Sequence, residues 1–350
     1  MKLLLLPLLL LTTSIFANIG LYEMGKAYYY GDGVEQDYDK AFSAFSYATK
    51  VGDSDAQTAL AIMHIEGKGT PQNDKQGITL LQESANQDHA KAQYYLGSMY
   101  YLGIGVDRDL EVAFQWIKKS AKKGYADAQQ NLALMYEQGN GTKKNALLAN
   151  KWYLESAKSG NSEAQYHLAK IYLDSDEYNQ AHIWLLKSAK QDNAQAQYHL
   201  GRLFSDGKGV PRDHDQAFEW YQKAVENGND EAVYILAQLY DQGLGVDIDY
   251  QKSHQLYQMA LTQGKLDAYQ DIARHYETGQ GIEKDLNKAY NFTIAAARKG
   301  HMASQRKIAL MYEQGIGTKK SLKKAKYWLK KLIKKGDKKA KEDLNRLQKR

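Results

Sequence analysis

The sequence contains no cysteine and only three prolines in 350 residues. The absence of cysteine excludes disulfide bonds, thiolate metal sites, cysteine nucleophiles and a lipid anchor attached to a cysteine. Beyond the N-terminal segment, no apolar run approaches the roughly 20 residues that a transmembrane helix requires. With 43% hydrophobic and 25% charged residues, the composition indicates a soluble, folded and mostly helical protein.

Residues 1–17 have the pattern of a secretory signal peptide. Lys2 supplies the positive charge, Leu3–Leu11 form a short apolar run, and Ala17 is a small residue suited to cleavage. The alternative is an uncleaved membrane anchor, but the apolar run is too short to cross a bilayer. We therefore expect a mature chain that begins near Asn18, in a bacterial periplasm or outside the cell.

The rest of the chain repeats one pattern. A small residue opens each unit, and successive openings lie 36 residues apart, except for the 32 residues between Ala164 and Ala196. A fixed period of this size predicts a solenoid of stacked helix pairs. The openings are Gly20, Ala56, Ala92, Ala128, Ala164, Ala196, Ala232, Ala268 and Ser304, which gives nine repeats within residues 18–337, and a tenth begins near Ala340.

Apolar residues recur at fixed distances from each opening. Four residues on lies an aliphatic side chain such as Leu96, followed by Gly or Ala. Eight residues on lies an aromatic side chain such as Tyr100, with His64 as the exception. Residues four apart share one face of a helix, so these positions predict the buried face of a first helix. A second helix follows, with a small residue such as Ala113 on its inner side.

A Gly-x-Gly loop separates the two helices in eight of the nine repeats, as at Gly103 and Gly105. All 28 glycines have a place in the repeat, so the pattern indicates a turn rather than a nucleotide-binding fingerprint, which would follow a strand. A side chain able to cap the second helix follows each loop. These predicted caps are Asp37, Asn73, Asp109, Asn145, Asp213, Asp249, Asp285 and Ser321.

This combination of positions resembles the Sel1-like repeat, a relative of the tetratricopeptide repeat, over nearly the whole mature chain. The resemblance implies an all-α, right-handed superhelical solenoid of stacked antiparallel helix pairs. The fifth repeat departs from the pattern, because between Tyr172 and Ala181 it is four residues short and has no glycine pair. We expect a tighter turn there, which arises either from neutral drift or as a bend between repeats one to four and six to nine.

No pattern indicates a catalytic, metal or cofactor site. His167, His182 and His199 could bind zinc if they converged, but ordinary partly exposed histidines are the simpler interpretation. Ser-x-x-Lys occurs four times, without the companion elements of penicillin-recognising enzymes. Some secreted Sel1-like proteins have been assigned penicillin binding or β-lactam hydrolysis, and they carry a disulfide in each repeat that this chain lacks. The Ser-x-x-Lys serines are Ser120, Ser205, Ser304 and Ser321.

The first helices of such solenoids line the concave surface, which is the usual binding surface. By analogy with tetratricopeptide repeats, positions two and six residues after the opening should face it. Tyrosine and basic side chains there suit recognition, although the tyrosines could equally pack against the next repeat. The candidate partner-binding residues are Tyr22, Lys26, Tyr94, Tyr166, Lys170, Tyr198, Arg202, Tyr234 and Arg274.

The C-terminal end is strongly basic. Residues 319–350 contain 15 Lys or Arg against three acidic residues, a net of +12 within a total of +6. We expect residues 338–350 to form a basic helix that caps the array, as solenoid ends require. The alternative is a basic anchor for an anionic surface, such as lipid A phosphates, anionic phospholipid or an acidic protein.

The sequence therefore favours a monomeric, non-catalytic scaffold or adaptor for protein–protein interactions in the bacterial cell envelope. We expect it to bind a protein or peptide segment along its concave face and not to bind nucleic acid, metal or cofactor. One alternative is a β-lactam-binding or β-lactamase-like enzyme, and another is a secreted host-interaction factor.

Overall fold

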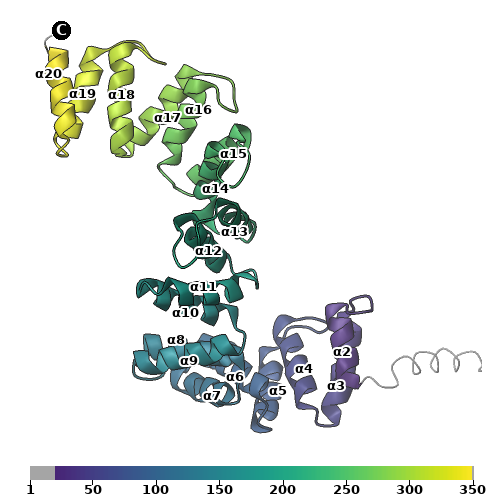
Figure 1. Cartoon of the computed structure of the whole chain (residues 1–350). Helices are drawn as coiled ribbons and strands as arrows, with labels where there is room; N and C mark the ends of the chain where they lie inside the picture. Colours follow the sequence, from purple (N-terminus) through teal and green to yellow (C-terminus); the bar gives the residue numbers. More distant parts are fainter. Residues whose placement is uncertain (1–19, 349–350) are drawn as a thin grey trace, which may run out of the picture. The chain divides into compact units, whose positions relative to one another are not determined.

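The structure, a computed structural model, describes residues 20–348, and these form an all-α solenoid of nineteen helices (Figure 1). The predicted signal peptide at residues 1–17 lies outside the described residues. The helices are α2 (Leu21–Tyr30), α3 (Tyr38–Lys50), α4 (Ser54–Glu66), α5 (Asp74–Asn86), α6 (Ala90–Leu102), α7 (Leu110–Lys122), α8 (Ala126–Gln138), α9 (Ala146–Lys158), α10 (Ser162–Asp174), α11 (Tyr178–Ala189), α12 (Ala194–Asp206), α13 (His214–Glu226), α14 (Asp230–Gln242), α15 (Tyr250–Thr262), α16 (Ala268–Thr278), α17 (Leu286–Arg298), α18 (Met302–Gln314), α19 (Leu322–Ile333) and α20 (Lys338–Gln348).

Most helices that follow one another in the chain pack together, as α6 does with α7 and α7 with α8. Even-numbered helices up to α18 are the first helices of the predicted repeats, and odd-numbered helices are the second helices. The chain divides into two compact units, of which unit 1 ends at Leu168 and unit 2 begins at Ala169.

All eight predicted caps of second helices are confirmed. The carboxylate of Asp109 accepts hydrogen bonds from the backbone amides of Glu111 (3.0 Å) and Val112 (2.9 Å) at the start of α7. The other seven capping side chains likewise accept from backbone amides in the first turn. Some first helices are capped in the same way, by Asp53 at α4 and Asn229 at α14, and these caps were not predicted.

The second glycine of each loop also determines how closely two repeats approach. A Cβ atom at Gly141 would lie 1.9 Å from the carbonyl oxygen of Leu110, at the start of the preceding second helix. At Gly33, which has no preceding repeat, nothing lies within 4 Å of the same atom. Both glycines have φ in the left-handed region, so only the contact with the neighbouring repeat distinguishes them.

The predicted core positions of the first helices are confirmed, since Ala92 and Leu96 are fully buried. In six of the nine repeats, the ring at the eighth position packs edge-on against an aromatic or histidine ring of the preceding second helix. The Phe114 and Tyr136 ring centroids lie 5.4 Å apart with an interplanar angle of 88°. His64, the exception in sequence, makes the same contact with Phe42 at 5.4 Å and 85°. The position therefore requires a flat ring rather than a particular residue.

In five of the nine repeats, a buried glutamine next to the opening residue joins the repeat to the one before it. The Nε2 atom of Gln93 donates to the carbonyl oxygen of Ala85 in the last turn of α5, at 3.2 Å. The bond satisfies a helix-end carbonyl that has no partner within its own helix. This role was not predicted, although glutamine recurs at this position. Equivalent bonds are made by Gln129, Gln165, Gln197 and Gln305.

The shortened fifth repeat has the tighter turn expected from its sequence. Only Ser175, Asp176 and Glu177 separate α10 from α11. Asp176 adopts φ of 58°, and the amide of Glu177 donates to the carbonyl oxygen of Tyr172 at 2.8 Å. Aspartate tolerates the left-handed conformation better than most residues, so this turn forms without glycine.

Candidate binding site

A hollow of about 430 Å³ opens over the first helices α6 and α8 of unit 1. It combines a mostly apolar lining with a few polar side chains, which is the usual composition of a ligand site. We call it the tyrosine hollow. Its apolar side chains are Met99, Leu102, Ile117, Leu134 and Met135, and its polar and aromatic side chains are Tyr94, Tyr95, Ser98, Tyr101, Asn131 and Asn140.

Two tyrosine–asparagine pairs join neighbouring repeats at this hollow. The Nδ2 atom of Asn131 donates to the hydroxyl of Tyr94 at 3.3 Å, and that of Asn140 donates to the hydroxyl of Tyr101 at 2.9 Å. Each hydroxyl accepts in this arrangement and keeps its own hydrogen to donate. Burial raises the pKa of Tyr94, so its hydroxyl stays protonated at neutral pH.

The Tyr94 ring is held on two sides. Its centroid lies 5.5 Å from that of Tyr95 and 5.2 Å from that of Tyr125, the residue that precedes α8. Both contacts fix the ring while it still lines the hollow. Tyr94 therefore packs against neighbouring rings and can still be reached from the hollow, because its side chain is only half-buried.

A second hollow of about 530 Å³, over α2 and α4, shares Tyr95 with the first. We call it the charged hollow, because Lys26, Lys68 and Lys91 line it together with Glu66. The Tyr29 hydroxyl donates to Glu66 at 2.7 Å and accepts from Lys68 at 3.2 Å. Burial and the Glu66 hydrogen bond raise the pKa of Tyr29 to about 12.

Three of the predicted tyrosines pack on the second helix of their own repeat. The centroid distances are 5.8 Å for Tyr22 and Phe45, 6.0 Å for Tyr198 and Tyr221, and 5.6 Å for Tyr234 and Tyr257. Tyr166 is half-buried on α10. Of these, Tyr22 also lines the charged hollow, as does Lys26, which forms an ion pair with Glu23 at 2.9 Å.

Lys170 and Arg202 line a separate, smaller hollow of about 240 Å³ in unit 2. His199 lies between first helices there, and burial, with the two nearby cations, lowers its pKa to about 4. The neutral imidazole therefore adds no charge at neutral pH. Asp174 and Asp206 also line this hollow, so its charge is mixed.

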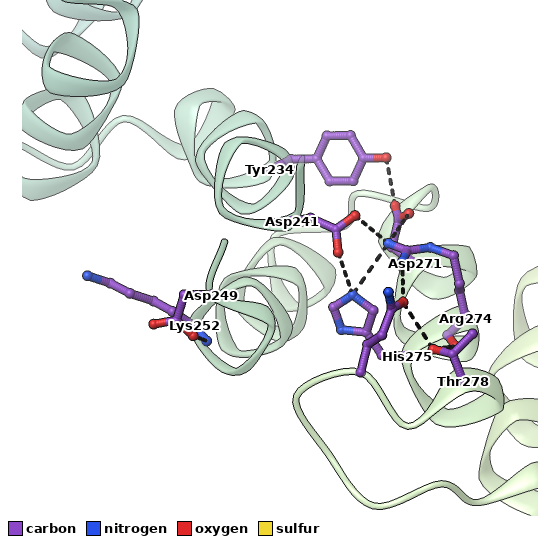
Figure 2. A network of polar contacts seen from close by, with 9 residues as sticks. Tyr234, Asp241, Asp249, Lys252, Asp271, Arg274, His275 and Thr278 are labelled. Atoms are coloured by element: carbon purple, nitrogen blue, oxygen red, sulfur yellow. Dashed lines mark hydrogen bonds and ion pairs between the residues drawn. The ribbon is translucent and has the colours of Figure 1, made fainter. Parts of the chain in front are cut away.

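Arg274 and Tyr234 belong to a network between α14 and α16, which Figure 2 shows. Arg274 Nη2 lies 2.6 Å from Asp241 Oδ2, and 3.6 Å from Asp271 Oδ1. The Tyr234 hydroxyl donates to Asp271 at 2.9 Å. His275 Nε2 lies 2.8 Å from Asp241 Oδ1, so one carboxylate serves both Arg274 and His275.

His275 is a buried polar residue whose contacts were not predicted from the sequence. Its side chain is 0% exposed and stacks on His254, with 5.5 Å between ring centroids. Burial lowers the pKa of His275, which Asp241 only partly offsets. The signal was present in the sequence, because the equivalent positions of other repeats hold an apolar residue such as Met135 or Met311.

The residues considered for metal or nucleophilic chemistry have structural contacts. The His167 ring stacks on Tyr153 at 3.6 Å, and the His182 ring meets Phe204 edge-on at 5.9 Å. The buried Ser120 hydroxyl donates to the carbonyl oxygen of Ala90 at 2.7 Å. Within residues 20–348, no three histidine, aspartate or glutamate side chains are grouped to hold a metal ion.

The stacked helix pairs define an α-solenoid repeat protein related to the tetratricopeptide proteins. The Sel1 repeat model matches nine successive segments, and the chain belongs to the Sel1 repeat family. The matched residues are 19–48, 54–89, 90–125, 126–161, 162–193, 194–229, 230–265, 266–301 and 303–337.

Two solved structures are similar over most of the chain. One is a protective antigen of uropathogenic Escherichia coli with an SLR fold, at 27% identity and a TM-score of 0.64, covering 94% of this chain and 79% of that one. The other is a Sel1 repeat protein from Oxalobacter formigenes, at 28% identity and a TM-score of 0.53, covering 87% of this chain and 90% of that one. Comparison with curated proteins found no match.

Across the part of the chain that the structure describes, every helix falls short of the length and apolarity needed to cross a bilayer.

Proposed function

We propose that this protein is a non-catalytic adaptor of the bacterial cell envelope, which binds an extended segment of a partner protein across the first helices of repeats 1 to 4. The observation that carries the proposal is the tyrosine hollow of about 430 Å³. Its volume falls in the range of known ligand sites, about 300 to 1,000 Å³.

The lining suggests how a segment would bind. An apolar side chain of the partner would contact Met99, Leu102 and Leu134, and burial of that side chain supplies the main driving force. The amide oxygen of Asn131 and the hydroxyl hydrogen of Tyr94 remain for the partner's backbone. Rigid tyrosine rings lose little conformational entropy on binding, which favours affinity from a modest contact area.

The charged hollow adds a preference for acidic groups. Lys26 and Lys68 form ion pairs with Glu23 and Glu66, at 2.9 and 2.8 Å, so the excess positive charge of this hollow comes from Lys91. Since Tyr95 lines both hollows, a segment could place an apolar side chain in one and a carboxylate in the other. We therefore expect partner segments that carry an aromatic or aliphatic residue near aspartate, glutamate or a C-terminal carboxylate.

A peptide selection tests this proposal directly. Peptides would be selected from a random phage library on residues 18–350, and their affinities measured by fluorescence polarisation. We expect Leu134→Arg, which places a charged chain in the tyrosine hollow, to weaken binding at least about tenfold, since each 1.4 kcal/mol lost is tenfold. Leu310→Arg, at the position equivalent to Leu134 in repeat 9, serves as the matched control and should leave affinity unchanged.

Two results would contradict the proposal. Selected peptides that bind Leu134→Arg as tightly as the unchanged chain would show that the hollow is not the site. Hydrolysis of the β-lactam nitrocefin by the purified chain would contradict the non-catalytic assignment. Capture from an envelope extract, with Leu134→Arg as the comparison, would then identify the natural partner.

A further inference from the structure

The second helix of the last repeat, α19, presents a strip of lysines to solvent. Its sequence LKKAKYWLKKLI contains five lysines and no acidic residue. Ala325, Trp328, Leu329 and Leu332 form its buried side. Lys323, Tyr327, Lys330 and the capping Lys334 follow one another at spacings of four, three and four residues, so they share the opposite face.

Tyr327 lies in the middle of this lysine strip. Its side chain is 60% exposed, so most of the ring is in contact with solvent. Its ring contact is with Trp328 on the same helix, at 5.5 Å between centroids. The tyrosine therefore presents an apolar ring and a polar hydroxyl to whatever the lysines meet.

The arginines and lysines of this end have different roles. Arg346 forms an ion pair with Glu313 at 2.5 Å, and Arg306 forms one with Asp337. These arginines hold α20 against α18. In contrast, Lys323, Lys330 and Lys334 form no ion pair with any described residue. The positive charge of the lysine strip is thus not needed within the fold.

We propose that the lysine strip with Tyr327 binds the anionic headgroups of a phospholipid bilayer. Flexible lysines suit a dense layer of mobile phosphates, to which each adds electrostatic attraction, whereas the cores of protein–protein interfaces are depleted of lysine. Tyrosine is enriched at membrane–water interfaces, where its ring lies among the headgroups. This surface lies on α19 and does not depend on the tyrosine hollow of unit 1.

Vesicle binding tests the proposal with the whole mature chain. Sedimentation would compare phosphatidylcholine vesicles with vesicles that also contain phosphatidylglycerol. We expect binding only to the anionic vesicles, and a decrease at high salt because mobile ions screen exposed charges. Replacing Lys323, Lys330 and Lys334 with glutamine should weaken binding about a hundredfold, or about fivefold per lysine.

A matched variant distinguishes the contribution of the lysine strip from that of the chain's other positive charges. Lys143, Lys144 and Lys151 in repeat 4 are exposed, and their replacement with glutamine removes the same charge. We expect that control to weaken binding by less than about threefold, because these lysines are not part of the lysine strip. Tyr327→Ser should weaken binding a few-fold without lowering the midpoint of thermal unfolding, since its ring is mostly exposed.

Three outcomes would overturn the proposal. Equal binding to neutral and anionic vesicles would exclude recognition of anionic headgroups. An equal loss in the repeat 4 control would exclude the lysine strip as the contact. Tighter binding to a single-stranded oligonucleotide or to polyglutamate than to the vesicles would assign this face to nucleic acid or to an acidic protein instead.

Discussion

Two interfaces between neighbouring repeats, which we call joints, have neutral residues in one case and charged residues in the other at equivalent positions. One lies between repeats 3 and 4 in unit 1, on α6 and α8, and the other lies between repeats 7 and 8 in unit 2, on α14 and α16. In both, a tyrosine hydroxyl of the earlier repeat bonds to the later one. Counted from the repeat openings, Tyr94 corresponds to Tyr234, Tyr101 to Asp241, Asn131 to Asp271, Leu134 to Arg274, and Met135 to His275.

The substitution of neutral by charged residues changes what each joint can do. Where Leu134 borders the tyrosine hollow, Arg274 instead reaches Asp241 on the neighbouring helix at 2.6 Å. The neutral joint leaves hydrogen-bonding groups at the hollow that have no partner of opposite charge, whereas the charged joint pairs its polar groups with one another. The same backbone arrangement therefore contains either an open hollow or an internal ion network.

Asp241→Ala should have the largest effect on stability. It removes the carboxylate that accepts from both Arg274 and His275, so Arg274 keeps only Asp271, at 3.6 Å, as an ion-pair partner, and partly or fully buried donors left without an acceptor cost about 1 to 3 kcal/mol each. Tyr101→Phe, at the equivalent position of the neutral joint, removes one hydrogen bond and should cost about 1 kcal/mol. Urea unfolding followed by circular dichroism measures both, and equal losses would contradict the distinction between the joints.

Both joints contain a loop glycine in close contact with the preceding second helix, and replacing it should destabilise both. Gly141→Ala and Gly281→Ala each place a Cβ against the preceding second helix, at 1.9 Å from the Leu110 oxygen and 2.4 Å from the Tyr250 carbonyl carbon. We expect losses of about 2 to 3 kcal/mol in each case, from overpacking and positive φ together. Gly33→Ala has only the positive φ and should lose about 1 kcal/mol. A similar loss for Gly33→Ala would mean that the inter-repeat contact contributes nothing.

The charged joint should also be sensitive to pH. Burial lowers the pKa of His275 in the folded state, so the unfolded state takes up the proton first as pH falls. The stability that depends on the neutral ring is present above the unfolded pKa of about 6.5 and is lost below it, by about 1 kcal/mol at pH 5.5. Thermal unfolding at pH 7.5 and 5.5 measures this loss. His275→Met, which introduces the residue of repeats 3 and 4, should reduce it, and an unchanged loss would assign it to another group.

Leu134→Arg should have the smallest effect on stability. The side chain is half-buried and borders the hollow, so its charged end can reach solvent, and we expect a change of less than about 1 kcal/mol. A circular dichroism melt that matches the unchanged chain would show that any loss of peptide binding arises at the hollow. A large loss of stability would instead place Leu134 in the core.

The sequence alone determined the helices, the caps of the second helices and the repeat, because these depend on residues close together in the chain. The spacing of four residues between Ala92 and Leu96 defines a helix face, and Asp109 caps a helix that begins one residue later. These signals recur in nine repeats, which made the solenoid predictable, and the tighter turn of the fifth repeat followed from its missing glycines.

Only the tertiary structure decided which of the equivalent tyrosines borders a hollow. The decisive contacts join residues one repeat apart, as Tyr94 and Asn131 are separated by 37 positions, and so are Tyr234 and Asp271. Local periodicity places both tyrosines on the same helix face but does not determine which side chains of the following repeat lie opposite them. Whether that neighbour is Leu134 or Arg274 determines whether the space stays open, because an arginine between two carboxylates forms ion pairs and a leucine cannot.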